Sequence, residues 1–297
     1  MNHKEKNSIA ILGLGKVGTA TGYLLRKAGY PIVAVASRTE SSLLKGVSFT
    51  GGKAYSSFSD AASHADTIII ATSDDAILST CTAISHNKSI LQGKKVIHMS
   101  GAGSLNLLDP AKNSGAYVGC IHPLQSFADV ENAIKNLPGS SFGITVQDEI
   151  KEWAVQIVQD IGGFPFFVAD NDKALYHAAA CIASNYLTTL IHVAEEIYIS
   201  LGLTRESALR SLWPLVRGTL ANIEQKGSIS ALTGPVVRGD TGTITNHLVA
   251  LDSFHAYLPA YCIMGMLAAD IGVERKTLSE EEAESIKELL RKGLKNE

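Results

Sequence analysis

The segment that most restricts the fold is IAILGLGKVGTATGYLLRKAGYPIVAVASRT, which runs from Ile9 to Thr39. A short apolar run leads into Gly13, Gly15 and Gly18, helical spacing follows, and the β-branched run PIVAVAS comes next. This order predicts a strand, a tight turn, a helix and a second strand, which is the unit from which parallel sheets are built.

The spacing of the three glycines gives the turn a mechanical meaning. Gly13 permits a tight turn, Gly15 lets the backbone approach a pyrophosphate, and Gly18 lets the helix pack on the sheet. The amino terminus of the helix then faces the anion. A glycine-rich turn without a ligand is the alternative. The predicted cofactor contacts in this turn are Gly13, Leu14, Gly15, Lys16, Val17 and Gly18.

Further apolar runs alternate with helical ones. The strand-like runs are ADTIIIATSDD, KKVIHMSG, AYVGCIHP, SSFGITV and FPFFVA, and EIKEWAVQIVQDIGG is a helical run between the last two. This pattern predicts an α/β fold with a doubly wound, mainly parallel Rossmann sheet. Ligands of such sheets bind beyond the carboxyl ends of the strands. We therefore expect a dinucleotide near Thr72, Ser73, Asp74, Ser100 and Gly101, although each of these alone is equally typical of a helix cap or turn.

The residues after the second strand indicate which cofactor binds. An NAD site usually has a carboxylate here, which hydrogen-bonds the ribose 2′-hydroxyl. This sequence has Ser37, Arg38 and Thr39 instead, and a guanidinium with two hydroxyls suits a 2′-phosphate. We expect NADP. NAD is the alternative cofactor, for which Glu40 would supply the carboxylate while Arg38 faces solvent.

The pattern changes to long helical runs after Ala169. We predict a dinucleotide-binding domain over residues 1–169 and an all-helical domain over 170–297, with residues 228–247 as a loop. On the first long helix Lys173, His177 and Ser184 fall on one face, because spacings of four and seven return to the same side. A polar stripe on an otherwise apolar helix predicts a cavity or a partner.

Composition excludes several classes of function. The 297 residues carry a formal net charge of −3, and charges of both signs are mixed along the chain, so it lacks the concentrated positive charge that binds nucleic acid. No apolar run is long enough for a membrane span, and the polar start MNHKEKNS lacks the apolar core of a signal peptide. The four cysteines form no CxxC pair, which argues against a metal site and for buried thiols in a reducing, cytoplasmic setting.

Several motifs in order carry a resemblance over nearly the whole chain: GLGKVG, HMSGAGS, GCIHPLQSF, DKALYHAAACIASNY and LTGPVVRGD. The sequence resembles a bacterial family of Rossmann-like proteins with a helical carboxy-terminal domain of unknown function. That family is related to 6-phosphogluconate dehydrogenase, β-hydroxyacid dehydrogenases and pyrroline-5-carboxylate reductase. The resemblance implies a 6-phosphogluconate-dehydrogenase-like helical domain and a homodimer paired through it.

The resemblance also implies site residues. Lys173 matches the catalytic lysine of β-hydroxyacid dehydrogenases, while His177 stands where those enzymes have an asparagine. His122 matches the histidine of the HP motif of prephenate dehydrogenases. The segment LTGPVVRGD is similar to the substrate-facing region of pyrroline-5-carboxylate reductase. Substrate contacts are therefore expected from Ser184, Asn185, Arg238 and Asp240, although an Arg238 to Asp240 brace is an equal alternative.

Together these patterns predict an NADP-dependent oxidoreductase without a metal. It would transfer a hydride between the cofactor and a small polar, possibly anionic, carbonyl, alcohol, imine or amine. A lysine or a histidine can supply the proton, so Lys173, His122 and His177 are the catalytic candidates. The active site is expected in the cleft between the domains. A non-catalytic NADP sensor is the competing interpretation, because a fold alone does not establish catalysis.

Overall fold

The computed structural model describes residues 6–86 and 91–294. Residues 1–5 of the polar start, residues 87–90 and the last three residues lie outside this range. The chain forms two compact units, residues 1–186 and 187–297. The first unit thus extends past Ala169, where the sequence pattern changes, and includes the first part of the long helical run that follows. In the described part of the chain, none of the helices combines the length and apolarity that crossing a bilayer requires.

One sheet organises the first unit, with strand order β3-β2-β1-β4-β5-β6-β7-β8. Neighbouring strands are parallel, except that β6 and β7 are antiparallel. The order of the first six strands is that of the doubly wound dinucleotide-binding fold, which confirms the predicted Rossmann sheet. The strands are β1 (Ile9–Leu12), β2 (Ile32–Ala36), β3 (Lys53–Tyr55), β4 (Thr67–Ile70), β5 (Lys95–His98), β6 (Tyr117–Pro123), β7 (Ser141–Val146) and β8 (Phe164–Phe167).

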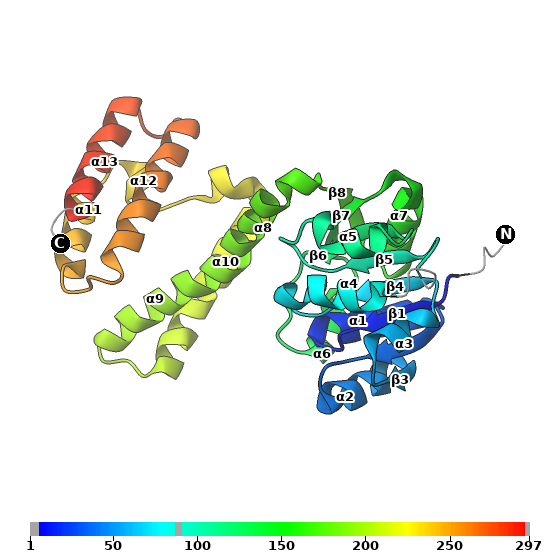
Figure 1. Ribbon diagram of the computed structural model, residues 1–297. Coiled ribbons are helices and arrows are strands. Elements are labelled where there is room, and N and C mark those ends of the chain that lie inside the picture. Colours follow the sequence, from blue (N-terminus) through cyan, green and yellow to red (C-terminus); the bar gives the residue numbers. More distant parts are fainter. Residues whose placement is uncertain (1–5, 87–90, 295–297) are drawn as a thin grey trace. The chain divides into compact units, whose positions relative to one another are not determined.

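Helices cover both faces of this sheet (Figure 1). Because side chains alternate along a strand, Ile9 and Ile11 of β1 pack in one core cluster, whereas Ala10 and Leu12 pack in the other. The first cluster is covered by α1 (Lys16–Lys27), α2 (Glu40–Thr50), α6 (Val130–Asn136) and α7 (Lys151–Asp160). The second is covered by α3 (Phe58–Ser63), α4 (Ile77–Ser85) and α5 (Asp109–Lys112).

The long apolar helix expected after residue 170 is interrupted. Helix α8 (Lys173–Cys181) is followed by a π-helical segment (Ile182–Tyr186) and then by α9 (Leu187–Ser200). Single π-helical turns inside α-helices are rare and often occur at functional sites. The break between the two compact units falls at the end of this π-helical segment.

The second unit is helical. Its core forms where α11 (Thr241–Leu251), α12 (Leu258–Glu274) and α13 (Glu280–Leu294) bury Ile244, Cys262 and Ile286 among other apolar side chains. Helix α10 (Arg205–Ala231) packs on α9 and contains a non-helical residue at Gly227. The predicted loop over 228–247 is wrong at both ends, because α10 continues to Ala231 and because Asp240 caps α11, which begins at Thr241.

The glycine-rich turn between β1 and α1 is tightly packed on one side and open on the other. Gly13 has φ +105°, and a methyl group there would lie 2.6 Å from Ala71 O. A methyl group at Gly18 would lie 2.1 Å from Gly13 O. At Gly15 nothing lies within 4 Å of such a group. Gly13 and Gly18 therefore serve the packing of the turn, whereas Gly15 leaves its backbone accessible.

We predict that Gly18→Ala lowers the free energy of unfolding by about 2 kcal/mol or more, because backbone must move to relieve the overlap. Gly15→Ala is the matched control and should leave the unfolding free energy within about 0.5 kcal/mol of the unchanged protein. Urea unfolding of the three proteins, followed by circular dichroism, makes the comparison. Equal midpoints for the two variants would contradict this packing of the turn.

Candidate functional site

The sequence-predicted residues of the first unit gather at one edge of the sheet. Strands β1, β2, β4, β5 and β6 are mutually parallel, so the loops that follow them leave from the same edge. This edge carries the glycine turn, Arg38, Thr72, Gly101 and His122. It holds two separate cavities, one at the glycine turn and one at the end of β6.

The cavity at the glycine turn has a volume of about 510 Å³. Thr72 Oγ1, on its wall, is buried and has no hydrogen-bond partner among the described residues. Thr39 caps α2 by accepting from Ser42 N. The predicted cofactor residues that line this cavity are Gly13, Leu14, Gly15, Ser37, Arg38, Thr39, Thr72 and Ser73.

Other predicted cofactor residues do not line that cavity. Lys16, Val17 and Gly18 belong to the first turn of α1, and Asp74 begins a short 3-10 turn. Ser100 is buried, and its hydroxyl oxygen accepts from Gly103 N at 2.8 Å. Several further residues line the cavity although they belong to no motif of the sequence, since the folding of α2, α3 and α4 against this edge brings them there. These are Ser42, Ser56, Phe58, Ala71, Ala76, Ser79 and Thr80.

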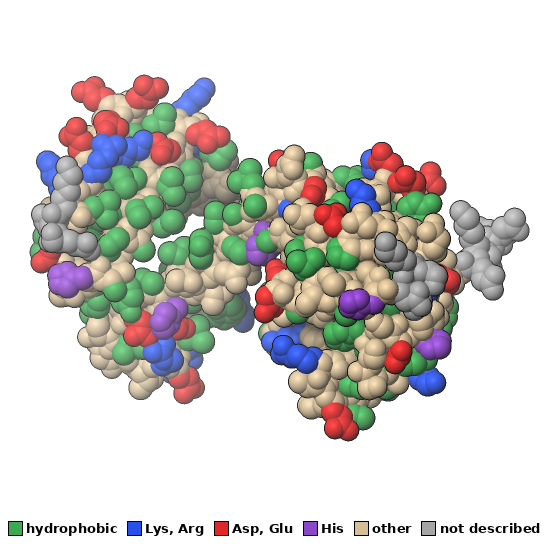
Figure 2. Space-filling model, in the orientation of Figure 1, with side chains coloured by type: hydrophobic (Ala, Val, Ile, Leu, Met, Phe, Trp, Pro, Cys, Tyr) green, Lys and Arg blue, Asp and Glu red, His purple; other side chains and the backbone are tan. Residues whose placement is uncertain are grey.

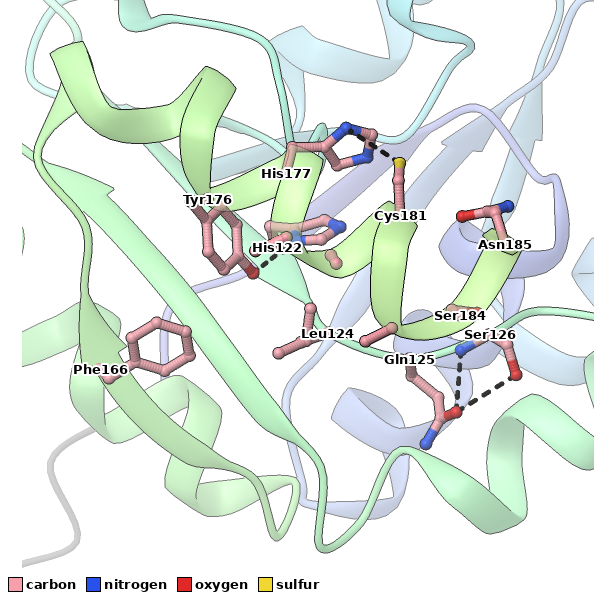
Figure 3. A pocket seen from close by; sticks show the side chains of 13 residues that line it. His122, Leu124, Gln125, Ser126, Phe166, Tyr176, His177, Cys181, Ser184 and Asn185 are labelled. Atoms are coloured by element: carbon pink, nitrogen blue, oxygen red, sulfur yellow. Dashed lines mark hydrogen bonds between the residues drawn. The ribbon is translucent and has the colours of Figure 1, made fainter. Parts of the chain in front are cut away.

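The second cavity has a volume of about 560 Å³, and a hydrogen-bonded pair of side chains lies on its wall (Figure 3). Tyr176 Oη lies 2.7 Å from His122 Nδ1, and the two rings meet edge to face. Phe166 packs on the other side of the Tyr176 ring. The pair joins α8 to the end of β6. Tyr176 was missed in the sequence, where it reads as one more large residue of an apolar helix.

Two glycines make room for the pair. Gly143 of β7 lies opposite His122 in the antiparallel register, and a methyl group there would come within 2.9 Å of Tyr176 Oη. A methyl group on Gly101 would lie 2.9 Å from His122 Nε2 and 2.3 Å from His177 Cδ2. One glycine thus admits the tyrosine hydroxyl. The other lets the backbone at Gly101 lie close to the rings of His122 and His177.

Lys173 lies behind this pair, away from the cavity wall. Its side chain is 2 % exposed, and its Nζ donates to Ser100 O at 3.2 Å and to Cys120 Sγ at 3.0 Å. Cys120 Sγ in turn donates to Ser100 O at 3.1 Å. The ammonium therefore ties the first turn of α8 to the ends of β5 and β6.

His177 does line the cavity, one turn after Lys173 on α8. Its ring lies 6.0 Å from the His122 ring, centroid to centroid, and its Nδ1 lies 3.7 Å from Cys181 Sγ. Cys181 is only partly buried, unlike the other three cysteines, so the prediction of four buried thiols is wrong at this position. Ser184 and Asn185 line the cavity too, because they lie in the π-helical segment.

Burial sets the protonation of the groups at this edge. It lowers the pKa of His122 to about 4, with help from the nearby Lys173 and His177 charges. It also lowers the pKa of His98 to about 3, again with help from Lys173. Burial raises the pKa of Tyr176 to about 12. His122 and Tyr176 are therefore both uncharged at neutral pH.

Two predicted substrate residues belong to the second unit. Asp240 caps α11, accepting from Thr243 N at 3.0 Å and from Thr243 Oγ1 at 2.7 Å. These bonds lower the pKa of its carboxyl group. Arg238 ends a short 3-10 turn just before it. Across residues 6–86 and 91–294, no cluster of three or more histidine, cysteine or acidic side chains has the arrangement of a metal site.

Comparison with known proteins agrees with this architecture. Residues 2–123 match the model of a Rossmann-like domain, and residues 140–267 match that of a domain of unknown function, DUF2520. The motifs had predicted this combination, which is thereby confirmed. No curated protein matches the sequence.

Solved structures share the fold at low sequence identity. A protein from Thermotoga maritima is 23% identical, with a TM-score of 0.70 over 90% of this chain and 99% of that one. Pyrroline carboxylate reductase of Plasmodium falciparum, solved with NADP bound, is 17% identical with a TM-score of 0.59 (96% and 98% covered). A reductive aminase of Aspergillus terreus, in complex with NADPH and ethyl-5-oxohexanoate, is 19% identical with a TM-score of 0.60 (98% and 94% covered).

The two buried histidines predict how stability depends on pH. Each has a folded-state pKa below its ordinary 6.5, so the unfolded chain takes up a proton first as the pH falls. Their contribution is complete above pH 6.5 and is lost as the pH falls toward about 4 for His122 and about 3 for His98. Between pH 7.5 and 5.5 we expect a loss of about 1 kcal/mol per histidine.

Urea unfolding at the two pH values measures this loss. In the folded protein His98 Nδ1 accepts a hydrogen bond from Ser100 N, and His98→Asn keeps an acceptor near that place. This variant should make the unfolding free energy depend less on pH. His64→Asn, at an exposed position of the same unit, should leave the dependence as it is. A pH dependence equally steep in all three proteins would rule out a neutral, buried His98.

Proposed function

We propose that this chain, which joins a Rossmann-like domain to a DUF2520 domain, is an NADP-dependent oxidoreductase that acts on a carbonyl or imine compound. The observation that carries the proposal is the neutral His122–Tyr176 pair, which opens into a cavity on the sheet edge that also bears the glycine turn. Two structural neighbours, solved with NADP and with NADPH, support the same assignment.

The cavity at the glycine turn fits a dinucleotide. The accessible backbone at Gly15 and the amino terminus of α1 suit a pyrophosphate, and the orphaned Thr72 hydroxyl offers a further hydrogen bond. Arg38 and Ser37 would receive the 2′-phosphate of NADP. NADPH supplies the hydride when it is bound. The chain must position the substrate and transfer the proton to it.

The proton would come from His122 without an imidazolium ion. A pKa of about 4 leaves almost no imidazolium at neutral pH, so the ring must act as a neutral N–H donor. With Tyr176 Oη donating to Nδ1, the proton of the ring is on Nε2, the nitrogen next to Gly101 in a side chain that lines the cavity. As Nε2–H gives up its proton, Nδ1 takes the tyrosine proton, and solvent restores the hydroxyl. His122 is neutral before and after.

Lys173 and His177 take supporting roles in this proposal. The Lys173 ammonium contacts a carbonyl oxygen and a thiol instead of the cavity, so its charge acts on His122 through space and helps to keep the ring neutral. His177 lines the same cavity as His122 and would orient the substrate carbonyl.

The cofactor assignment is tested by Arg38→Ala. Losing a charge-assisted bond to the 2′-phosphate should weaken NADPH binding about tenfold or more, while NADH binding changes little. Lys45→Ala removes a positive charge from the exposed face of the nearby helix α2 and serves as the control. Fluorescence titration at fixed ionic strength measures both cofactors. Tighter binding of NADH than of NADPH would instead support NAD use through Glu40.

The proton-transfer assignment is tested by steady-state NADPH oxidation with a panel of carbonyl compounds. His122→Asn should lower kcat about a hundredfold or more, since general acid catalysis contributes about that much. Tyr176→Phe should lower kcat less and leave KM unchanged. Tyr186→Phe, at an exposed tyrosine outside the cavity, should change neither constant.

An NADP sensor without catalysis remains the second candidate. It predicts normal NADPH binding and no turnover with any compound of the panel, so that His122→Asn has no activity to lose. Undiminished turnover in His122→Asn would contradict the proposed proton donor while leaving the oxidoreductase assignment intact.

We also propose a homodimer. Most of the large exposed hydrophobic side chains lie between residues 175 and 267, with Leu175 76% and Leu215 67% exposed. Figure 2 shows hydrophobic side chains over the visible surface of the second unit. Such surfaces are normally buried against a partner. Light scattering should give about 63 kDa, twice the chain mass of 31.5 kDa, and a 31.5 kDa particle at micromolar concentration would contradict the dimer.

A further inference from the structure

The residues that the structure describes on the wall of the cavity at His122 are neutral side chains and two histidines. Among the described residues that line it there is no lysine, arginine, aspartate or glutamate, and all of them belong to the first compact unit. Leu124 and Phe166 form an apolar side. Gln125 and Ser126, which are hydrogen-bonded to each other, and the π-helical residues Ser184 and Asn185 provide neutral polar groups.

A substrate carboxylate would therefore enter this cavity without a lysine or arginine on the wall to pair with it. The nearest buried cation, Lys173, is bound to Ser100 O and Cys120 Sγ and does not line the wall. His122 is neutral and so adds no positive charge. Moving an ionised carboxylate out of water without a partner is strongly unfavourable, whereas an apolar substituent gains from the same transfer.

Helix α8 and the segment after it give the cavity its width. Tyr176 and Ala180 lie on one face of α8, four residues apart, and Ala179 is also on the wall. The π-helical turn then brings the adjacent residues Ala183 and Ser184 to the same wall. Small side chains thus make up much of this wall. A larger side chain at Ala180 would fill part of the cavity.

We propose that this cavity selects a neutral ketone, aldehyde or imine with an apolar body, and that it excludes 2-oxo acids. This inference rests on the proposed function and narrows its substrate class. It differs from the anionic substrate that the sequence, through Arg238, led us to consider. In the reduction the hydride of NADPH adds to the carbonyl carbon, the π electrons move to oxygen, and that oxygen takes the proton of His122 Nε2. The products are an alcohol and NADP⁺.

Acetophenone and benzoylformate are a matched pair of probes, because they share the phenyl ketone and differ in a methyl group against a carboxylate. Equilibrium dialysis with the full chain, with and without NADP⁺, measures their binding without any need for turnover. We expect acetophenone to bind about tenfold tighter or more, which corresponds to about 1.4 kcal/mol. Equal or tighter binding of benzoylformate, or no binding of either probe, would overturn the proposal.

Variants place the binding in this cavity. Ala180→Leu should weaken acetophenone binding about tenfold, whereas Ala178→Leu, at an exposed position of the same helix outside the cavity, should leave it unchanged. Phe166→Lys puts a cation on the wall from a partly exposed strand position and should shift the preference toward benzoylformate. Acetophenone binding that responds to none of these changes lies elsewhere and would contradict the inference.

Turnover separates this inference from the proposed function. Acetophenone that binds in an Ala180-dependent way but never oxidises NADPH would refute the oxidoreductase and leave the cavity preference standing. NADPH oxidation with benzoylformate but not with acetophenone would support the oxidoreductase and refute the preference.

Discussion

The site depends on how the first turn of α8 is fixed to the edge of the sheet. Lys173 Nζ donates to Ser100 O and Cys120 Sγ in a buried position. Just before it, Asp170 accepts from Ser104 Oγ at 2.6 Å and from Leu105 N at 2.9 Å. Both contacts reach the loop that follows β5. They set the position of the helix that carries Tyr176, His177 and the small residues of the cavity wall.

The same burial that fixes the helix also determines the chemistry. Burial of the imidazole, with the nearby Lys173 ammonium as the second cause, lowers the pKa of His122 to about 4. The ring then needs a hydrogen-bond partner of its own, and Tyr176 Oη provides it at 2.7 Å. Because the imidazole of His122 and the hydroxyl of Tyr176 are both uncharged, neither group requires a charged side chain nearby. This agrees with a cavity whose apolar side is formed by Leu124 and Phe166.

Local patterns in the sequence were enough to predict the sheet. Glycine spacing and apolar runs depend on neighbours along the chain, and they placed the β1 turn, the strands from β4 to β8 and the NADP-type residues after β2. Arg38 and Thr72 do line the cavity at the glycine turn. The fold of the second half was predicted only as helical, and the start of α11 at Thr241 was missed because its cap, Asp240, sits in a glycine-rich stretch.

The residues that were missed depend on contacts between distant segments. Tyr176 gains its role from His122, 54 positions earlier, and from the missing side chain of Gly143 across the sheet. The helical spacing put Lys173 and His177 on one face of the helix, yet it could not show that Cys120 and Ser100 would enclose the lysine. Nor does the sequence pattern reveal the π-helical turn that brings Ala183, Ser184 and Asn185 to one wall.

Nitrogen NMR of the His122 imidazole, assigned with His122→Asn, tests the central claim most directly. From pH 5 to 8 the ring should stay neutral with its proton on Nε2, and adding NADP⁺ should shift its signals while those of His192 in the second unit stay in place. A ring that titrates near pH 6.5, or signals that ignore NADP⁺, would contradict a neutral proton donor beside the cofactor.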